Sequence, residues 1–173
     1  MTKIGFVSLG CSKNLVDTEV MLHHLATAGY EITAEAEEAD IIVLNTCGFI
    51  ASAKNESIEN ILDLAWLKEN GQLKGLICTG CLAERYREEI MKEMPEVDAL
   101  LGVGSLSAIT DAVKAVEKGE KFTRFDDKET SPLGGDRVLT TPEYTAYLKV
   151  GEGCDNKCTY CAIPLIRGRF RSR

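Results

Sequence analysis

The sequence contains no apolar run of about eighteen residues or more, which excludes a transmembrane helix. Its opening, MTKIGFVSLGC, lacks the basic start and long apolar stretch of a targeting segment and is typical of a strand. Basic residues are in deficit, since 20 lysines and arginines stand against 27 acidic residues. A broad basic face for nucleic acid or anionic lipid is therefore not expected, nor is a membrane partner.

Cysteine is also sparse. Seven cysteines in 173 residues are too few for a secreted disulfide scaffold, and their number is odd. They indicate a cytoplasmic protein, in which such cysteines bind metal or carry out chemistry. The length corresponds to one domain of about 150 residues with a short remainder.

Apolar runs and helical periodicities alternate along the first part of the chain. Strands are expected at 3–9, 30–34, 40–45, 73–79 and 99–103. Helices are expected between them, within 16–28, 58–71, 86–94 and 105–119, the last with Ser105 as its N-cap. The alternation predicts an α/β fold with a parallel sheet and helices on both faces.

The composition then changes. Residues 1–126 are expected to form the α/β domain, and the polar residues 127–143, with a Gly-Gly pair and two prolines, form a linker. Residues 144–150 alternate into a new strand that runs into a cysteine-rich loop. One strand and one loop cannot form a core, so residues 144–173 are expected to begin a second, truncated domain.

Four arginines and no acid lie within residues 161–173, at positions 167, 169, 171 and 173. They could form a phosphate-binding tail. The plainer interpretation is that they belong to a loop of the second domain and pair with carboxylates of a cofactor or of the protein.

Three cysteines each follow a strand and precede a helix: Cys11, Cys47 and Cys81. Loops that follow parallel strands emerge at the carboxyl edge of the sheet, so the three thiols could converge on one site. Small buried cysteines are the alternative, although these should sit within strands. Cys78 does lie within a strand, and a core role is expected for it rather than a redox pair with Cys81.

A second set is compact: Cys154, Cys158 and Cys161 fall within eight residues. Such a loop can wrap an iron–sulfur cluster, and three ligands leave one iron open. A structural zinc site would need a fourth ligand, but no cysteine or histidine follows Cys161. His23 and His24 lie far upstream on an amphipathic helix and are expected to be surface or packing residues.

The segment CDNKCTYC resembles the signature of radical S-adenosylmethionine enzymes. YLKVGEGCDNKCTYCAIPLIRGRFRSR is similar to their methylthiotransferase branch, and GCSKNLVDTE, NTCGFIASAKNESI and TGCLAERY resemble its amino-terminal domain. The segments SKNLVD, CGFI and IPLIRG are more similar to the RimO-like ribosomal-protein enzymes than to the MiaB-like tRNA enzymes.

This resemblance implies two 4Fe-4S clusters and S-adenosyl-L-methionine as cofactors. It places Cys11, Cys47 and Cys81 on one cluster, which carries the sulfur. Cys154, Cys158 and Cys161 fall on the other, which binds S-adenosylmethionine and generates a 5′-deoxyadenosyl radical. Residues 144–173 would be the first strand and cluster loop of a partial βα barrel whose remainder is missing.

The implied activity is methylthiolation of an aspartate in the small-subunit ribosomal protein number twelve. A flavodoxin or ferredoxin is the expected electron donor, and this chain alone is expected to be an inactive amino-terminal fragment. The alternatives are a tRNA adenosine methylthiotransferase, a non-catalytic iron–sulfur electron-transfer module and a zinc-binding interaction module. Four protein ligands per cluster would be usual for electron transfer, so three disfavour that alternative.

Overall fold

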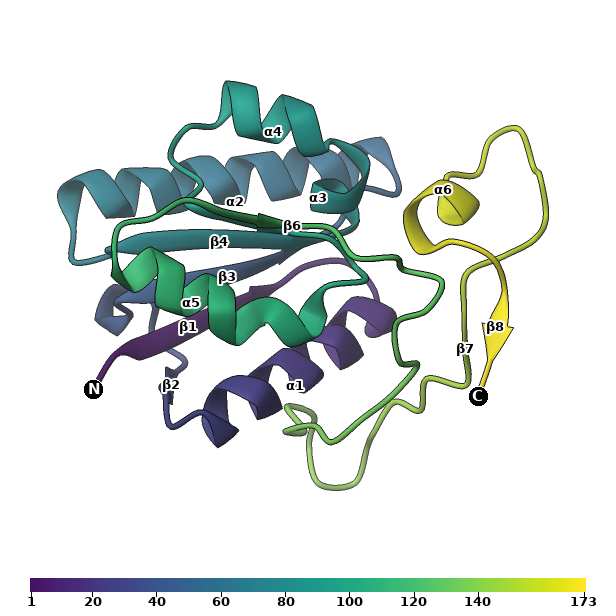
Figure 1. The fold of residues 1–173 in the computed structure, drawn as a ribbon, viewed down its shortest axis with the longest axis horizontal. Helices are drawn as coiled ribbons and strands as arrows, with labels where there is room; N and C mark the ends of the chain where they lie inside the picture. The colour runs from purple at the N-terminus through teal and green to yellow at the C-terminus, as the bar shows by residue number, and fades with distance from the viewer.

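The computed structural model describes all residues from Met1 to Arg173. Its main feature is a six-stranded, entirely parallel sheet of order β2-β1-β3-β4-β5-β6 (Figure 1). The strands are β1 (Lys3–Ser8), β2 (Glu31–Thr33), β3 (Ile41–Thr46), β4 (Gly75–Gly80), β5 (Ala99–Leu101) and β6 (Phe122–Arg124). The parallel sheet expected from the sequence is confirmed.

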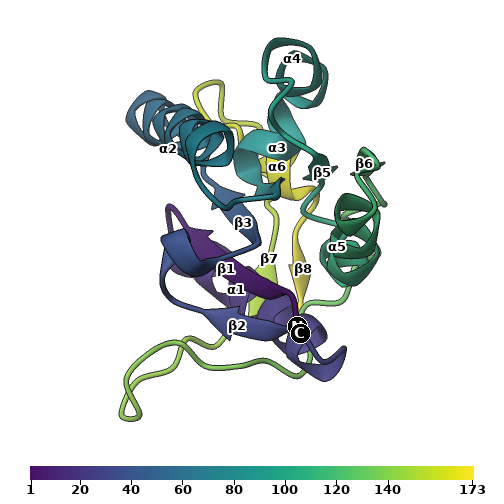
Figure 2. The same ribbon diagram turned by 90° about the vertical axis from the view of Figure 1, so that its left-hand side faces the viewer.

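Helices cover both faces of this sheet, because the central strands are apolar on both sides (Figures 1 and 2). Ile41 and Val43 of β3 pack toward α1 (Ser12–Thr27) and α5 (Ile109–Glu117). Ile42 and Leu44 face α2 (Ala51–Asn70), α3 (Cys81–Arg85) and α4 (Arg87–Glu93). All six residues of β3 and all six of β4 are buried.

Several local features of residues 1–126 differ from the expectations. The short helix α3 and the edge strand β6 were not expected, since each is too short to carry a clear periodicity. Ser105 precedes the 3-10 turn η2 (Leu106–Ala108) but makes no side-chain cap. Its hydroxyl instead accepts a hydrogen bond from the backbone N–H of Asp126 at 2.7 Å, which holds the chain leaving β6 against the sheet edge.

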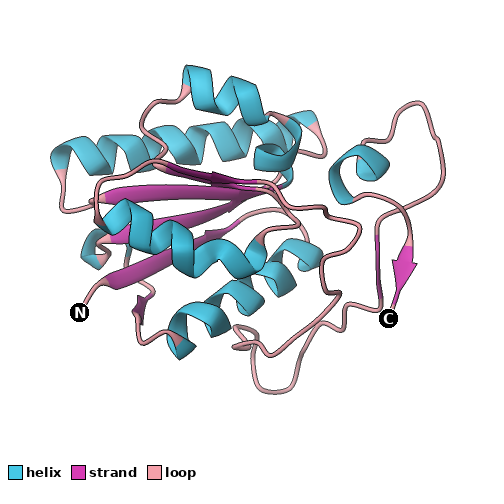
Figure 3. Cartoon of the chain, viewed as in Figure 1, coloured by secondary structure: helices cyan, strands magenta, loops and turns pink.

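After β6 the chain has no regular element until β7 (Gly151–Glu152), as Figure 3 shows. The cysteine loop follows β7 and leads into α6 (Ile163–Arg167) and β8 (Arg171–Ser172), which pairs antiparallel with β7. The strand expected over 144–150 is absent, because no neighbouring strand pairs with it or covers its apolar face. Tyr144 and Leu148 accordingly remain 89% and 69% exposed.

The division into residues 1–126, 127–143 and 144–173 as domain, linker and second domain stays a prediction. So does the assignment of the last segment to a partial barrel. None of the helices is long and apolar enough to cross a membrane.

Candidate functional site

The cysteines that follow strands lie at one edge of the sheet. Cys11 is the N-cap of α1 after β1, Cys47 follows β3, and Cys81 is the first residue of α3 after β4. Because β1, β3 and β4 are adjacent in the sheet, their carboxyl ends bring all three cysteines to the same edge. The shared edge is as expected, whereas their role as ligands stays a prediction.

Each of these cysteines has a glycine next to it, at Gly10, Gly48 and Gly80. A Cβ atom at Gly10 would lie 2.8 Å from Cys47 Cβ and 2.9 Å from its Sγ, so the first two loops touch. A Cβ atom at Gly48 would lie 2.9 Å from the backbone N of Leu82, beside Cys81. Only glycine permits the three loops to approach this closely.

Polar side chains fix the loops from behind. The Ser57 hydroxyl accepts from Cys47 N at 2.9 Å and donates to Cys47 O at 2.8 Å. The Asn14 amide donates to Leu9 O and Thr46 O, each at 2.9 Å, and so joins the loop after β1 to the end of β3. Asn45 in turn donates to Asn14 O at 2.8 Å. The loops are therefore held by side chains of α1, α2 and β3.

The three thiols differ in exposure. Cys11 is exposed, while Cys47 and Cys81 are 8% and 6% exposed. Burial raises the pKa of the Cys81 thiol, the Arg167 guanidinium opposes that rise, and Cys47 and Cys11 lie near enough to add to it. One open thiol beside two buried ones gives the site access from solvent on the Cys11 side.

No three histidine, cysteine, aspartate or glutamate side chains are grouped so as to hold a single metal ion. Thiolates are the ligands that iron–sulfur clusters take, so the three cysteines of this glycine-lined edge are of the donor type that such a cluster needs.

Cys78 is different. It is fully buried within β4 and packs in the core beneath α2 and α3. Burial raises the pKa of its thiol far above the ordinary range, so it stays protonated. The expected core role is what the structure shows.

The second cysteine set lies on the loop between β7 and α6. Cys158 is exposed, and Cys154 and Cys161 are partly exposed. The loop is folded by hydrogen bonds from Cys161 N to Cys158 O and from Cys154 N to Gly168 O, each at 3.1 Å. The Asn156 amide also donates to Cys154 Sγ at 3.4 Å. Three thiols on one loop, each at least partly exposed, can hold a cluster with a further ligand from outside.

Helix α6 brings this loop to the first site. Ala162 and Ile166 pack with Cys81 in a small apolar cluster, and Figure 1 shows α6 opposite the carboxyl ends of the strands. Arg167, at the end of α6, is 4% exposed and donates to Cys81 Sγ at 3.4 Å. The two cysteine sets, more than seventy positions apart in the sequence, thus belong to one region of the molecule.

A buried ionic network surrounds this junction. Arg167 Nη1 lies 2.5 Å from Asp17 Oδ2 and 3.3 Å from Glu152 Oε2, and Lys149 Nζ lies 2.8 Å from Asp17 Oδ1. Lys13 also reaches Glu152, at 3.0 Å. Burial alone would raise the pKa of Glu152, but Arg167 and Lys149 lower it to about 2. Of the four arginines expected to pair with carboxylates, Arg167 does so most completely.

Sequence reasoning did not single out Asn14 or Asp17 as individual residues. Both are buried on α1, at 0% and 3% exposed, among apolar positions of that helix. A polar residue on the core side of an amphipathic helix needs a buried partner, and this pattern could have marked both residues. The partner of Asp17 is Arg167, which lies 150 residues away and could not be inferred from the helix.

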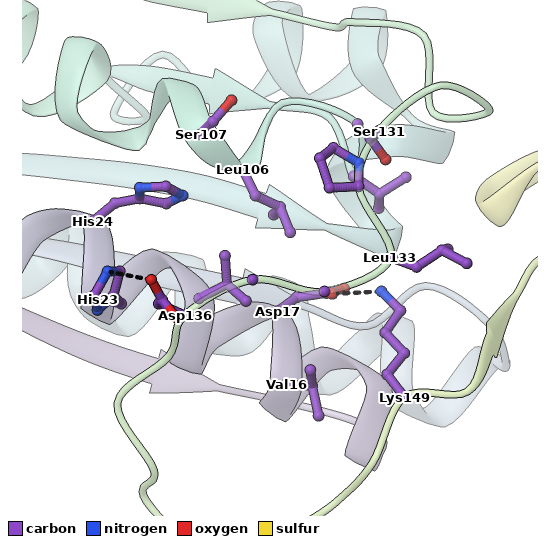
Figure 4. Close-up of a pocket in the computed structure, with 16 residues that line it drawn as sticks. Val16, Asp17, His23, His24, Leu106, Ser107, Ser131, Leu133, Asp136 and Lys149 are labelled. Carbon is purple, nitrogen blue, oxygen red and sulfur yellow. Dashed lines mark hydrogen bonds and ion pairs between the residues drawn. The ribbon is translucent and has the colours of Figure 1, made fainter. Parts of the chain in front are cut away.

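A separate cleft of about 260 Å³ lies between α1, the loop after β5 and residues 131–136 (Figure 4). His23 and His24 line it, and His23 lies 4.0 Å from Asp136. None of the seven cysteines lines this cleft. Both histidines are partly buried and lie away from the cysteine site, while their role as packing or surface residues stays a prediction.

Residues 3–102 match the model of a family described as "Uncharacterized protein family UPF0004". The match covers more than half of the chain and includes all three strand-end cysteines. The chain belongs to this family.

The whole chain is also similar to proteins named "Ribosomal protein uS12 methylthiotransferase RimO". It is 53% identical over 176 residues to the one from Caldicellulosiruptor saccharolyticus, covering 100% of this chain and 40% of that protein. The relative from Lachnoclostridium phytofermentans is 56% identical over 171 residues, covering 98% and 39%. The Clostridioides difficile relative is 51% identical over 178 residues, covering 100% and 39%. The chain thus spans about 40% of the length of these relatives.

Proposed function

We propose that this chain takes part in the methylthiolation of an aspartate in the small-subunit ribosomal protein uS12, by radical S-adenosylmethionine chemistry. The supporting observation is the meeting of two cysteine sets. The loop that carries Cys154, Cys158 and Cys161 leads into α6, and α6 packs against α3 beside Cys81. Relatives that are about half identical to the chain, over about 40% of their own length, are named uS12 methylthiotransferases.

In this proposal Cys11, Cys47 and Cys81 hold one 4Fe-4S cluster, and Cys154, Cys158 and Cys161 hold another. Three protein ligands at each cluster leave one iron for an external group. When bound, the clusters and S-adenosylmethionine supply the radical chemistry that removes hydrogen from an unactivated carbon, which no acid–base side chain can do.

The chain's own residues position these groups. Ser57 fixes the backbone of Cys47, and Asn14 ties the loop after β1 to the end of β3. Arg167 joins the end of α6 to Cys81 and Asp17. In this proposal, these contacts keep the two cysteine sets in one region, as a transfer between two clusters would require.

Residues 1–173 alone are proposed to bind clusters without turning over substrate. Cys158 is exposed, as are Leu148 and Val150, at 69% and 65%. A radical must be enclosed away from water, and a misplacement of about 1 Å can cost on the order of a hundredfold in rate. Formation of 5′-deoxyadenosine with a strong reductant, compared with a longer protein carrying the same residues, measures this. Methylthiolated product from residues 1–173 at a comparable rate would contradict it.

The cluster assignment is tested by anaerobic reconstitution of the chain. We expect a brown protein with iron and acid-labile sulfide. Cys47→Ala should lose the cluster on the sheet edge and keep the one on the loop, whereas Cys78→Ala should keep both. Iron content that is unchanged by Cys47→Ala, or zinc in place of iron and sulfide, would refute the assignment.

The acceptor is tested with a longer enzyme that carries these residues, offered both uS12 and tRNA under anaerobic turnover. The expected result is a methylthio mass shift on the uS12 aspartate. Charge supports this choice, since the first 160 residues carry 16 basic and 27 acidic side chains and would repel a tRNA backbone. A mass shift on tRNA adenosine alone would overturn it.

A further inference from the structure

The residue that carries a new inference is Arg167. It is the last residue of α6 and is 4% exposed, although arginine is seldom buried. It donates hydrogen bonds to Asp17, Glu152, Asn14 and Cys81, at the junction between α1, α3 and the cysteine loop. A buried guanidinium with five donors requires partners on every side.

The two ends of the guanidinium have different partners. Nη1 faces the carboxylates of Asp17, at 2.5 Å, and Glu152, at 3.3 Å. Nη2 faces Asn14 Oδ1 and the sulfur of Cys81, at 3.4 Å. One edge therefore anchors the arginine, while the other presents N–H groups to a cysteine of the sheet edge.

Stability alone does not explain this arrangement. Replacing a buried ion pair by packed apolar residues is commonly neutral or stabilising, because desolvation offsets the attraction. Ala162 and Ile166 already supply an apolar contact between α6 and Cys81. The charge at this position needs a further role, and the group it reaches beyond its carboxylates is the Cys81 sulfur.

The surroundings of that sulfur are otherwise uncharged or negative. Asn14 Oδ1 lies 3.6 Å from Cys81 Sγ and acts as an acceptor, and the other contacts are the apolar side chains of α6. Arg167 is the cation in hydrogen-bond contact with it. It also stands six residues after Cys161, so one side chain contacts one cysteine set and is rigidly attached to the other.

We propose that Arg167 is a positioning residue that donates a charge-assisted hydrogen bond to the Cys81 sulfur, and that it thereby raises the reduction potential of the cluster on the sheet edge. The inference rests on the proposed function, because Cys81 must be a cluster ligand. Hydrogen bonds to cluster sulfurs and nearby charge are among the factors that set such potentials. The contact also fixes the loop of Cys154–Cys161 relative to that cluster.

The test is a reductive titration, followed by electron paramagnetic resonance, of the chain in which Cys154, Cys158 and Cys161 are alanine. Only the sheet-edge cluster then gives a signal. Arg167→Met should make this cluster harder to reduce by at least tenfold in its equilibrium constant, about 59 mV for one electron. Arg167→Lys, which keeps the charge but not the fork, should restore part of the shift. Arg169→Met is the matched control, because its side chain is 81% exposed, and it should leave the potential unchanged.

A cluster in Arg167→Met with the potential of the Arg169→Met control would overturn the inference. If Arg167→Met binds no iron, the potential of Arg167→Lys is compared with that of Arg169→Lys. A lower potential in Arg167→Lys supports the inference, and equal potentials overturn it. If neither Arg167 variant binds iron while Arg169→Met does, the inference is overturned, because Arg167 is then needed for the site to form and not to set its potential. Absence of iron from the parent chain refutes the proposed function instead.

Discussion

At the scale of single residues, the sheet edge that carries Cys11, Cys47 and Cys81 depends on glycines, which have no Cβ atom, beside each cysteine. Gly10 has a φ of +89°, and a Cβ there would overlap Cys47. Gly29 has the same φ of +89°, but no atom lies within 4 Å of where its Cβ would be. Substituting these two glycines separates two effects of an added side chain. Backbone strain arises at both positions, whereas steric overlap arises only at Gly10.

Gly10→Ala is therefore expected to abolish the sheet-edge cluster, because the added methyl group pushes the loop of Cys47 away from Cys11. Gly29→Ala should cost a similar left-handed strain, about 1–2 kcal/mol, and keep its iron. Iron and sulfide per chain after anaerobic reconstitution, with urea unfolding of both metal-free variants, measures this. Equal iron in the two variants would show that close packing of the loops is not needed.

At the scale of elements, the amino ends of the strands are tied together by Asp40. Its carboxylate accepts from Lys3 N at 2.9 Å and pairs with Lys74 Nζ at 2.7 Å, so β1, β3 and β4 are joined at their start. The Lys3 N–H and then Lys74 lower the pKa of Asp40. The cysteines lie at the opposite ends of the same three strands. The contacts of Asp40 therefore help to align the strand ends at which the cysteines lie.

Because the folded pKa of Asp40 is lowered, its stabilisation is complete above about pH 3.9, the ordinary value for aspartate. It is lost as the pH falls through the folded pKa. Asp40→Asn should lower the free energy of unfolding by about 1 kcal/mol at neutral pH, and the difference from wild type should shrink on acidification. Urea unfolding across this range measures it, with Asp63→Asn, exposed on α2, as the control. A difference that does not change with pH would contradict the assignment.

Some elements could be predicted from the sequence and others could not. The runs that became β3 and β4 are short and apolar on both faces, as is typical of buried strands in a parallel sheet, so they were predictable. The strand expected over 144–150 failed because alternation shows only which side of a strand is apolar, while a strand forms when another pairs with it. The cysteines at strand ends were predictable from topology, but the contact between Arg167 and Cys81 depends on how α6 docks.

At the scale of the whole molecule, residues 144–173 are held to α1 by charge, since Asp17 binds both Lys149 and Arg167. Glu19 on the same helix binds the preceding segment, through Arg137 at 3.3 Å and Thr140 N at 2.9 Å. Much of the apolar surface of the segment remains exposed. A segment attached through ion pairs rather than a core can detach while the sheet stays folded.

Asp17→Asn removes the carboxylate that both cations share, and so should release this segment. Arg167 and Lys149 can regain water by detaching, so the cost appears as local opening and does not reach the several kcal/mol expected when a fully trapped charge is left unpaired. Hydrogen exchange should become faster over 149–172 and stay unchanged in β3 and β4. Asp63→Asn, exposed on α2 and outside this segment, is the control and should alter neither region. Unchanged protection of α6 in Asp17→Asn would mean that the apolar contact of Ala162 and Ile166 with Cys81 suffices to dock the cysteine loop.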